Sequence, residues 1–134
     1  MNHLIISWIS ALLSMLVFDG IWLSLMAKRF YAPHLGHLMA AIPNFFPAAF
    51  FYPLYSFGLA YLILVPALQG QASLLKIFFS GALFGLVTYA AYDLTNQATL
   101  KNWSTLLTLV DLTWGTLLTG TVAVISVVVT NYFA

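Results

Sequence analysis

Three aspartates are the only acidic residues of the chain, and their positions could support proton or cation chemistry. Asp19, Asp93 and Asp111 all lie in long apolar segments. A carboxylate at the centre of a membrane-spanning helix costs about 2.5–3.5 kcal/mol, and such residues typically mark ion, proton or substrate pathways. Three carboxylates held close together cannot all ionise without a counter-charge. The residue types therefore predict a buried site that binds or transports a proton, a cation or a small polar solute.

The apolar segments around these residues predict four membrane-spanning helices. The chain has 134 residues, of which 63% are hydrophobic and only 5% are charged, too few charges to coat a water-exposed surface. Runs of about 20 mostly apolar residues, the length that crosses a bilayer, cover residues 4–26, 45–68, 74–97 and 105–129. The composition excludes an ordinary soluble enzyme, a nucleic-acid-binding protein and a disordered chain.

The connections between the helices predict how they are arranged. The polar connections at residues 69–73 and 98–104 are short, so successive helices must run antiparallel. The expected fold is all-α: a single transmembrane domain over residues 1–134, folded as a four-helix up-down bundle in a lipid bilayer.

The longest connection, residues 27–44, predicts one interfacial segment between the first and second spans. It combines Lys28 and Arg29 with aromatic and aliphatic side chains, a composition suited to the headgroup region. His34 and His37 have a spacing that could supply two metal ligands on one helical turn. Because the chain has no cysteine and no carboxylate lies beside them, we interpret both histidines as interfacial and predict no metal site.

The basic residues favour one orientation in the membrane. Lys28, Arg29 and Lys101 follow the first and third spans, whereas only Lys76 follows the second. Cytoplasmic loops carry the excess of Lys and Arg. Both termini are therefore expected on the outer side of the membrane, with the two basic loops in the cytoplasm.

The three aspartates are expected at one depth in the bundle. Asp19 and Asp93 lie near the ends of helices that run toward the basic loops, and Asp111 lies near the start of a helix that runs back. At 1.5 Å per residue, all three lie within roughly 6–11 Å of the same membrane face. Residues on the same helical faces complete the expected ligand or ion site. Its residues are Asp19, Asp93, Asp111, Trp22, Tyr89, Tyr92, Asn96, Thr108 and Trp114.

Two other roles for these residues stay open. A membrane enzyme acting on a lipid or lipid-like substrate could use one aspartate as a general base and another to orient it. A structural or accessory subunit could use the carboxyl groups for hydrogen bonds between helices, each worth about 0.6–2 kcal/mol. We favour the binding or transport site over an enzyme. Four helices alone enclose a transport pathway poorly, so a homodimer is expected if the protein transports a solute. The sequence identifies no substrate, ion or cofactor.

Short sequence echoes occur around the aspartates. Asp19-x-x-Trp22 recurs as Asp111-x-x-Trp114, on spans that run in opposite directions. The spacing places Asp and Trp on adjoining helical faces. Echoes this short do not indicate an inverted repeat, and we interpret them as coincidence.

Three runs resemble a known family, the small bacterial predicted membrane proteins called domain of unknown function 2177 (DUF2177). These runs are Phe18-Asp-Gly-Ile-Trp22, Tyr92-Asp-Leu-Thr-Asn-Gln-Ala-Thr-Leu-Lys-Asn-Trp103 and Val110-Asp-Leu-Thr-Trp-Gly-Thr116. The resemblance implies a four-span protein of the bacterial inner membrane and implies no particular activity. The residues that match its motifs are Asp19, Trp22, Tyr92, Asp93, Thr95, Asn96, Lys101, Trp103, Asp111, Trp114 and Gly115.

Overall fold

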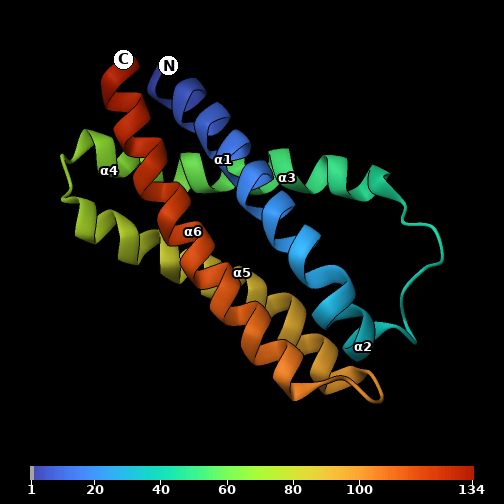
Figure 1. Cartoon of the computed structure of the whole chain (residues 1–134). Helices are drawn as coiled ribbons and strands as arrows, with labels where there is room; N and C mark the ends of the chain where they lie inside the picture. Colours follow the sequence, from blue (N-terminus) through green and yellow to red (C-terminus); the bar gives the residue numbers. More distant parts are fainter. Residues whose placement is uncertain (1) are drawn as a thin grey trace.

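Four long helical segments form the molecule, and both termini lie at the same end (Figure 1). The computed structural model describes residues 2–134. The segments long and apolar enough to cross a membrane are Asn2–Leu35, Phe45–Gln69, Leu74–Thr99 and Thr105–Phe133. The predicted all-α fold with four spans is confirmed. The first span continues beyond its predicted end, the fourth ends at Phe133 and not at residue 129, and the other ends lie within two residues of the prediction.

The first helical segment is longer than predicted. Helix α1 (Asn2–Met26) continues through the π-helical turn η1 (Ala27–Tyr31) into α2 (Ala32–Leu35). Pro33 lies in the first turn of α2, directly after η1, and does not end the helical segment. The connection to the second span is therefore residues 36–44, shorter than the predicted interfacial segment.

The second segment consists of α3 (Phe45–Leu59), the π-helical turn η2 (Ala60–Leu64) and α4 (Val65–Gln69). The Asn44 side chain caps it by accepting a hydrogen bond from the Phe46 backbone N–H at 3.1 Å. In Figure 1 this segment runs at a slant to the other three, and α1 crosses it. The slant separates the beginning of α3 from the end of α1.

Helices α5 (Leu74–Thr99) and α6 (Thr105–Phe133) lie side by side and antiparallel (Figure 1). Glycines allow their close approach. A Cβ atom on Gly81 would lie 2.6 Å from the Ala123 Cβ, and one on Gly85 would collide with the Gly115 carbonyl oxygen. Small residues four apart thus permit backbone-to-side-chain contact between these two spans.

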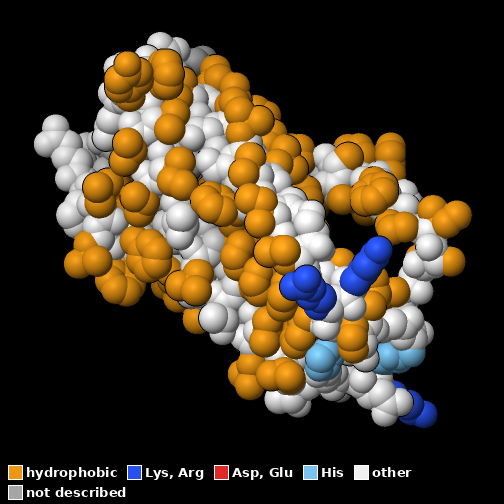
Figure 2. Space-filling model, viewed as in Figure 1, with side chains coloured by type: hydrophobic (Ala, Val, Ile, Leu, Met, Phe, Trp, Pro, Cys, Tyr) orange, Lys and Arg blue, Asp and Glu red, His pale blue; other side chains and the backbone are white. Residues whose placement is uncertain are grey.

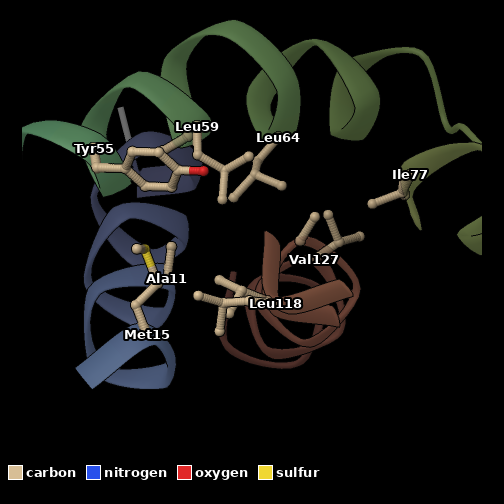
Figure 3. Close-up of a cluster of buried hydrophobic side chains, with 11 residues drawn as sticks. Ala11, Met15, Tyr55, Leu59, Leu64, Ile77, Leu118 and Val127 are labelled. Atoms are coloured by element: carbon tan, nitrogen blue, oxygen red, sulfur yellow. The ribbon is translucent and has the colours of Figure 1, made fainter. Parts of the chain in front are cut away.

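The apolar core lies in the half of the molecule that holds the termini. Figure 3 shows side chains from α3 and η2 pointing toward α1 and α6, with Tyr55 at one edge of the cluster. The fully buried members include Ala11, Met15, Leu59, Leu64 and Val122. This packing fixes the crossing of the second span over the first and fourth, and leaves the other half of the molecule for a cavity.

Candidate functional site

A cavity of about 410 Å³ lies between the four spans, in the half of the molecule away from the termini. Its volume is within the roughly 300–1,000 Å³ typical of small-molecule sites. Every span contributes to its wall, and so do η1 and α2. The lining residues are Asp19, Trp22, Leu23, Tyr31, Leu35, Phe51, Tyr52, Tyr55, Thr88, Tyr89, Tyr92, Asp93, Leu107, Asp111 and Trp114.

The structure brings most of the residues named from the sequence to this cavity, including all three aspartates. Asn96 and Thr108 do not line it. The Thr108 hydroxyl is buried and accepts a hydrogen bond from Trp103 Nε1 at 2.9 Å. Asn96 lies nearly one turn beyond Asp93, close to the end of α5, where its carbonyl accepts the Leu100 N–H.

Asp19 is buried with a donor on each carboxyl oxygen. Trp114 Nε1 donates to Oδ1 at 2.8 Å, and the Tyr52 hydroxyl donates to Oδ2 at 2.9 Å. These donors come from α6 and α3, so the carboxyl group of Asp19 connects three spans. Hydrogen bonds to an ionised group are worth about 1.5–3 kcal/mol, more than those between neutral groups. The arrangement is that of a structural link between helices.

Within the described part of the chain, Asp111 has a donor on one oxygen only. The Tyr31 hydroxyl donates to Asp111 Oδ1 at 2.8 Å, and Trp22 Nε1 donates to that hydroxyl at 3.0 Å. The rings of Trp22 and Trp114 stack with centroids 4.2 Å apart and planes 6° apart. The two Asp-x-x-Trp motifs are thus reciprocal: Trp114 contacts Asp19 directly, and Trp22 reaches Asp111 through Tyr31.

Asp93 differs from both. Its side chain is fully buried, and within residues 2–134 neither carboxyl oxygen has a hydrogen-bond partner. The carboxyl groups of Asp93 and Asp111 are close enough that a proton on one could form a hydrogen bond to the other. A buried acceptor without a partner costs about 1–3 kcal/mol, and more if it is charged. The Asp93–Asp111 pair therefore has unused capacity to hold a proton or a cation.

Several lining residues were not anticipated from the sequence. Tyr31 lies in the stretch expected to leave the first helix, and Tyr52 lies in the aromatic-rich first part of the second span, where tyrosine is common at membrane interfaces. Tyr55 is anchored by hydrogen bonds to Thr119 at 2.8 Å and Thr88 at 3.0 Å. The Tyr52–Tyr55 spacing of three residues, which places both on one side of α3, was a signal that could have identified them.

The cavity reaches the molecular surface near the basic end of the bundle. Leu23, Phe51 and Tyr92 line it and are 45%, 43% and 56% exposed. Figure 2 shows basic and histidine side chains gathered near the end of the molecule where α1 leads into α2. Lys28 and Arg29 are exposed in this region. These cations lie at the same end of the molecule as the mouth, and the cavity lining itself contains carboxyl groups and no Lys or Arg among the described residues.

The three carboxyl groups share a cavity without meeting at a single point. Among residues 2–134, no group of three His, Asp or Glu side chains is placed to hold a metal ion. Asp19 is occupied by its own donors, and only Asp93 and Asp111 face each other. The arrangement provides a carboxyl pair in an aromatic cavity.

Comparison with known proteins identifies the family. A family model described as "Predicted membrane protein (DUF2177)" matches residues 4–128, so the chain belongs to this family of predicted membrane proteins. The match confirms the resemblance seen in the Asp-containing runs. No curated protein and no solved structure matches the chain.

Proposed function

We propose that the protein binds a monovalent cation at the Asp93–Asp111 pair, in exchange for a proton that the pair holds when no cation is bound. The observation that carries the proposal is the full burial of Asp93 beside Asp111, with two carboxyl oxygens that have no hydrogen-bond partner among residues 2–134. Intramembrane carboxyl groups of this kind serve ion and proton pathways. We further propose that this exchange drives transport of the cation across the membrane.

The charge balance of the pair sets the stoichiometry. Two carboxylates side by side in a poorly solvated cavity repel each other, so one shared proton leaves the pair with a single negative charge. A monovalent cation between the two groups leaves the same net charge once that proton has gone to water. One proton released per cation bound is the expected ratio.

Asp19 has a different role in this proposal. Each of its oxygens already accepts one hydrogen bond, from Tyr52 or from Trp114, so it has less acceptor capacity left for a ligand than Asp93 has. We assign it to holding the wall of the cavity. The interpretation of the aspartates as structural links between helices therefore suits Asp19, while Asp93 and Asp111 form the exchange pair.

The proposal includes a location. Lys28 and Arg29 lie in η1, and Lys101 lies in the connection between α5 and α6, all at the end of the bundle nearest the cavity. This excess of basic residues supports a cytoplasmic location for that end, with both termini outside. The membrane would be the bacterial inner membrane. Four helices form a thin wall around a pathway, so we propose a homodimer as the transporting unit.

Proton release on cation addition tests the exchange. Purified protein in weakly buffered detergent solution is titrated with sodium, potassium and tetramethylammonium chlorides while a pH-sensitive dye follows released protons. We expect about one proton per chain with at least one of these cations, as the charge balance requires. Asp93→Asn removes a carboxyl group from the pair and should abolish the release.

His37→Asn is the matched control, because it removes a titratable group that does not line the cavity. It should release as many protons as the unmodified chain. The proposal is wrong if no cation releases a proton, or if Asp93→Asn releases as many as the control.

A second candidate is an enzyme that acts on a lipid-like substrate. It is favoured by exposed apolar side chains that line the cavity, such as Phe51 and Leu23, on helices long and apolar enough to cross a membrane. An amphiphile entering there could place its head group beside Asp93, with one carboxylate as general base. Comparison of extracted lipids from cells with and without the gene tests this, and unchanged lipids would contradict it.

A further inference from the structure

We infer that the cation is an organic ammonium ion carrying an apolar or aromatic substituent; this inference rests on the proposed exchange at Asp93 and Asp111. The juxtaposition behind it is an unpartnered, fully buried carboxyl group in a cavity whose walls are mostly aromatic rings. Asp93 supplies the charge that attracts an ammonium group, and the rings supply the surface that recognises its substituents.

Aromatic rings surround the space from three directions. Trp22 and Trp114 form a stacked pair on the α1–α6 side, Tyr52 and Tyr55 lie on α3, and Tyr89 lies on α5. The negative faces of such rings attract a cation within about 6 Å of the ring centre, and quaternary ammonium ligands are characteristically bound by aromatic cages. A quaternary ammonium group has no N–H to donate, but it can still be bound through this attraction.

The size of the cavity argues against a bare inorganic ion. A cavity of about 410 Å³ is much larger than one water molecule, whose share of liquid volume is about 30 Å³. An inorganic ion would need several oxygen ligands at short distances to replace its water. Among residues 2–134 no cluster of three acidic or histidine ligands exists for this. A substituted ammonium ion instead fills the space with its own apolar groups.

The free acceptors also fit a single positive charge. Among residues 2–134, both oxygens of Asp93 and one oxygen of Asp111 have no donor, whereas each oxygen of Asp19 accepts one hydrogen bond. Leu23, Leu35 and Leu107 complete the wall and would contact a substituent. The ligand class is therefore a monovalent amphiphilic cation, with its charge beside Asp93 and its apolar part toward the mouth.

Two probes that share a shape but differ in charge test this inference. Phenyltrimethylammonium and tert-butylbenzene have the same outline, and only the first is a cation. Quenching of the tryptophan fluorescence of the purified protein measures their binding, with sodium chloride keeping the ionic strength constant. We expect saturable binding of phenyltrimethylammonium, at least tenfold tighter than that of tert-butylbenzene, and loss of this preference in Asp93→Asn.

A ring substitution checks the contribution of the aromatic wall. Phe51→Leu removes a ring at a partly exposed position that carries no hydrogen bond, so the variant should fold. Loss of one cation–π contact should weaken phenyltrimethylammonium about 2- to 30-fold and leave tert-butylbenzene nearly unchanged. Phe57→Leu, which replaces an exposed ring that does not line the cavity, is the matched control and should bind both probes as the unmodified chain does.

The outcomes separate this inference from the proposed exchange. If phenyltrimethylammonium binds no better than tert-butylbenzene while sodium or potassium releases a proton that depends on Asp93, the organic-cation inference is wrong and the exchange stands. If no cation, organic or inorganic, binds or releases a proton, both are wrong. Charge-selective binding with a proton released per phenyltrimethylammonium bound supports both.

Discussion

Asp19 and Asp93 have the same side chain in one cavity, and their hydrogen-bond partners set them apart. Asp19 receives donors from Trp114 and Tyr52, while Asp93 receives none among the described residues. A satisfied carboxylate contributes to the stability of the helix arrangement, whereas an unpartnered one costs free energy. Costly groups that persist in a fold are expected at functional sites, so Asp93 is the better candidate for ligand chemistry.

This difference predicts opposite effects on stability for the same substitution. In Asp19→Asn, an NH2 group replaces one carboxylate oxygen and faces the donor that this oxygen accepted. That donor loses its acceptor, which should cost about 1–3 kcal/mol. In Asp93→Asn, the amide can donate to Asp111, so stability should be unchanged or higher. Thermal unfolding of both variants in the same detergent measures the difference. Equal destabilisation of the two would contradict it.

Tyr31 predicts a second effect at the scale of one side chain. Tyr31→Phe removes the donor to Asp111 and the acceptor of Trp22 Nε1, two contacts at once. Leaving these partly buried groups without partners should cost up to about 1–3 kcal/mol each and lower the unfolding temperature. Tyr61→Phe makes the same change at a position that is 60% exposed and should leave the unfolding temperature unchanged. If the Tyr31→Phe protein were as stable as the Tyr61→Phe protein, the two hydrogen bonds of the Tyr31 hydroxyl would contribute little to stability.

The aspartate trio could be predicted from the sequence, but its tyrosine partners could not. Asp19, Asp93 and Asp111 are conspicuous because charged residues are rare in apolar spans. Tyr31 and Tyr52 are not, because tyrosine is common at membrane interfaces for reasons unrelated to any site. Only the structure shows their hydroxyl groups directed at carboxyl oxygens.

At the scale of helices, the π-helical turn η1 explains why Tyr31 reaches the site. Nine residues separate it from Trp22, so an uninterrupted α-helix would place the two roughly 180° apart around the axis. The turn Ala27–Tyr31 accommodates one extra residue and rotates Tyr31 back by roughly 100°. Lys28 and Arg29, whose charges led to the prediction that the span ends before Tyr31, lie within this same turn. Polar residues predicted the end of the span, while the helix itself continued.

The remaining helix ends were predictable because their signals are local. Ser73 and Ser104 precede the third and fourth spans, and their hydroxyl groups cap the helices by accepting the backbone N–H groups of Lys76 and Leu107. Gly70 follows the second span. The slant of that span was not predictable, since it results from packing of Leu59 and its neighbours against other helices.

The close contact of α5 and α6 predicts a strong response to a single methyl group. Gly85→Ala would drive its Cβ into the Gly115 carbonyl oxygen and the Thr119 side chain, and overpacking of this kind costs about 1–3 kcal/mol or more. Gly20→Ala is the matched control, because apart from its chain neighbours and its own helix backbone no atom of the described residues lies within 4 Å of its added Cβ. It should be neutral or stabilise the helix by up to about 1 kcal/mol. Thermal unfolding compares them, and equal stability would contradict the packing of α5 on α6.

At the scale of the whole molecule, the core and the cavity occupy opposite halves. The cluster around Leu59 and Leu64 fixes the crossing of the spans near the termini, and the slant of the second span leaves space at the other end (Figures 1 and 3). Because the cavity lies near the basic loops, the orientation of the molecule decides which side of the membrane the Asp93–Asp111 pair serves.

The orientation can be measured cleanly because the chain has no cysteine of its own. Ala40→Cys places a single thiol in the connection between the first and second spans, and Gln69→Cys places one at the opposite end of the second span. The excess of basic residues beside the first site predicts that it is cytoplasmic. In intact cells, a membrane-impermeant maleimide should label Gln69→Cys and should label Ala40→Cys only after permeabilisation. The reverse pattern would place the mouth of the cavity on the outer side, and equal labelling of both sites would indicate that the chain inserts in two orientations.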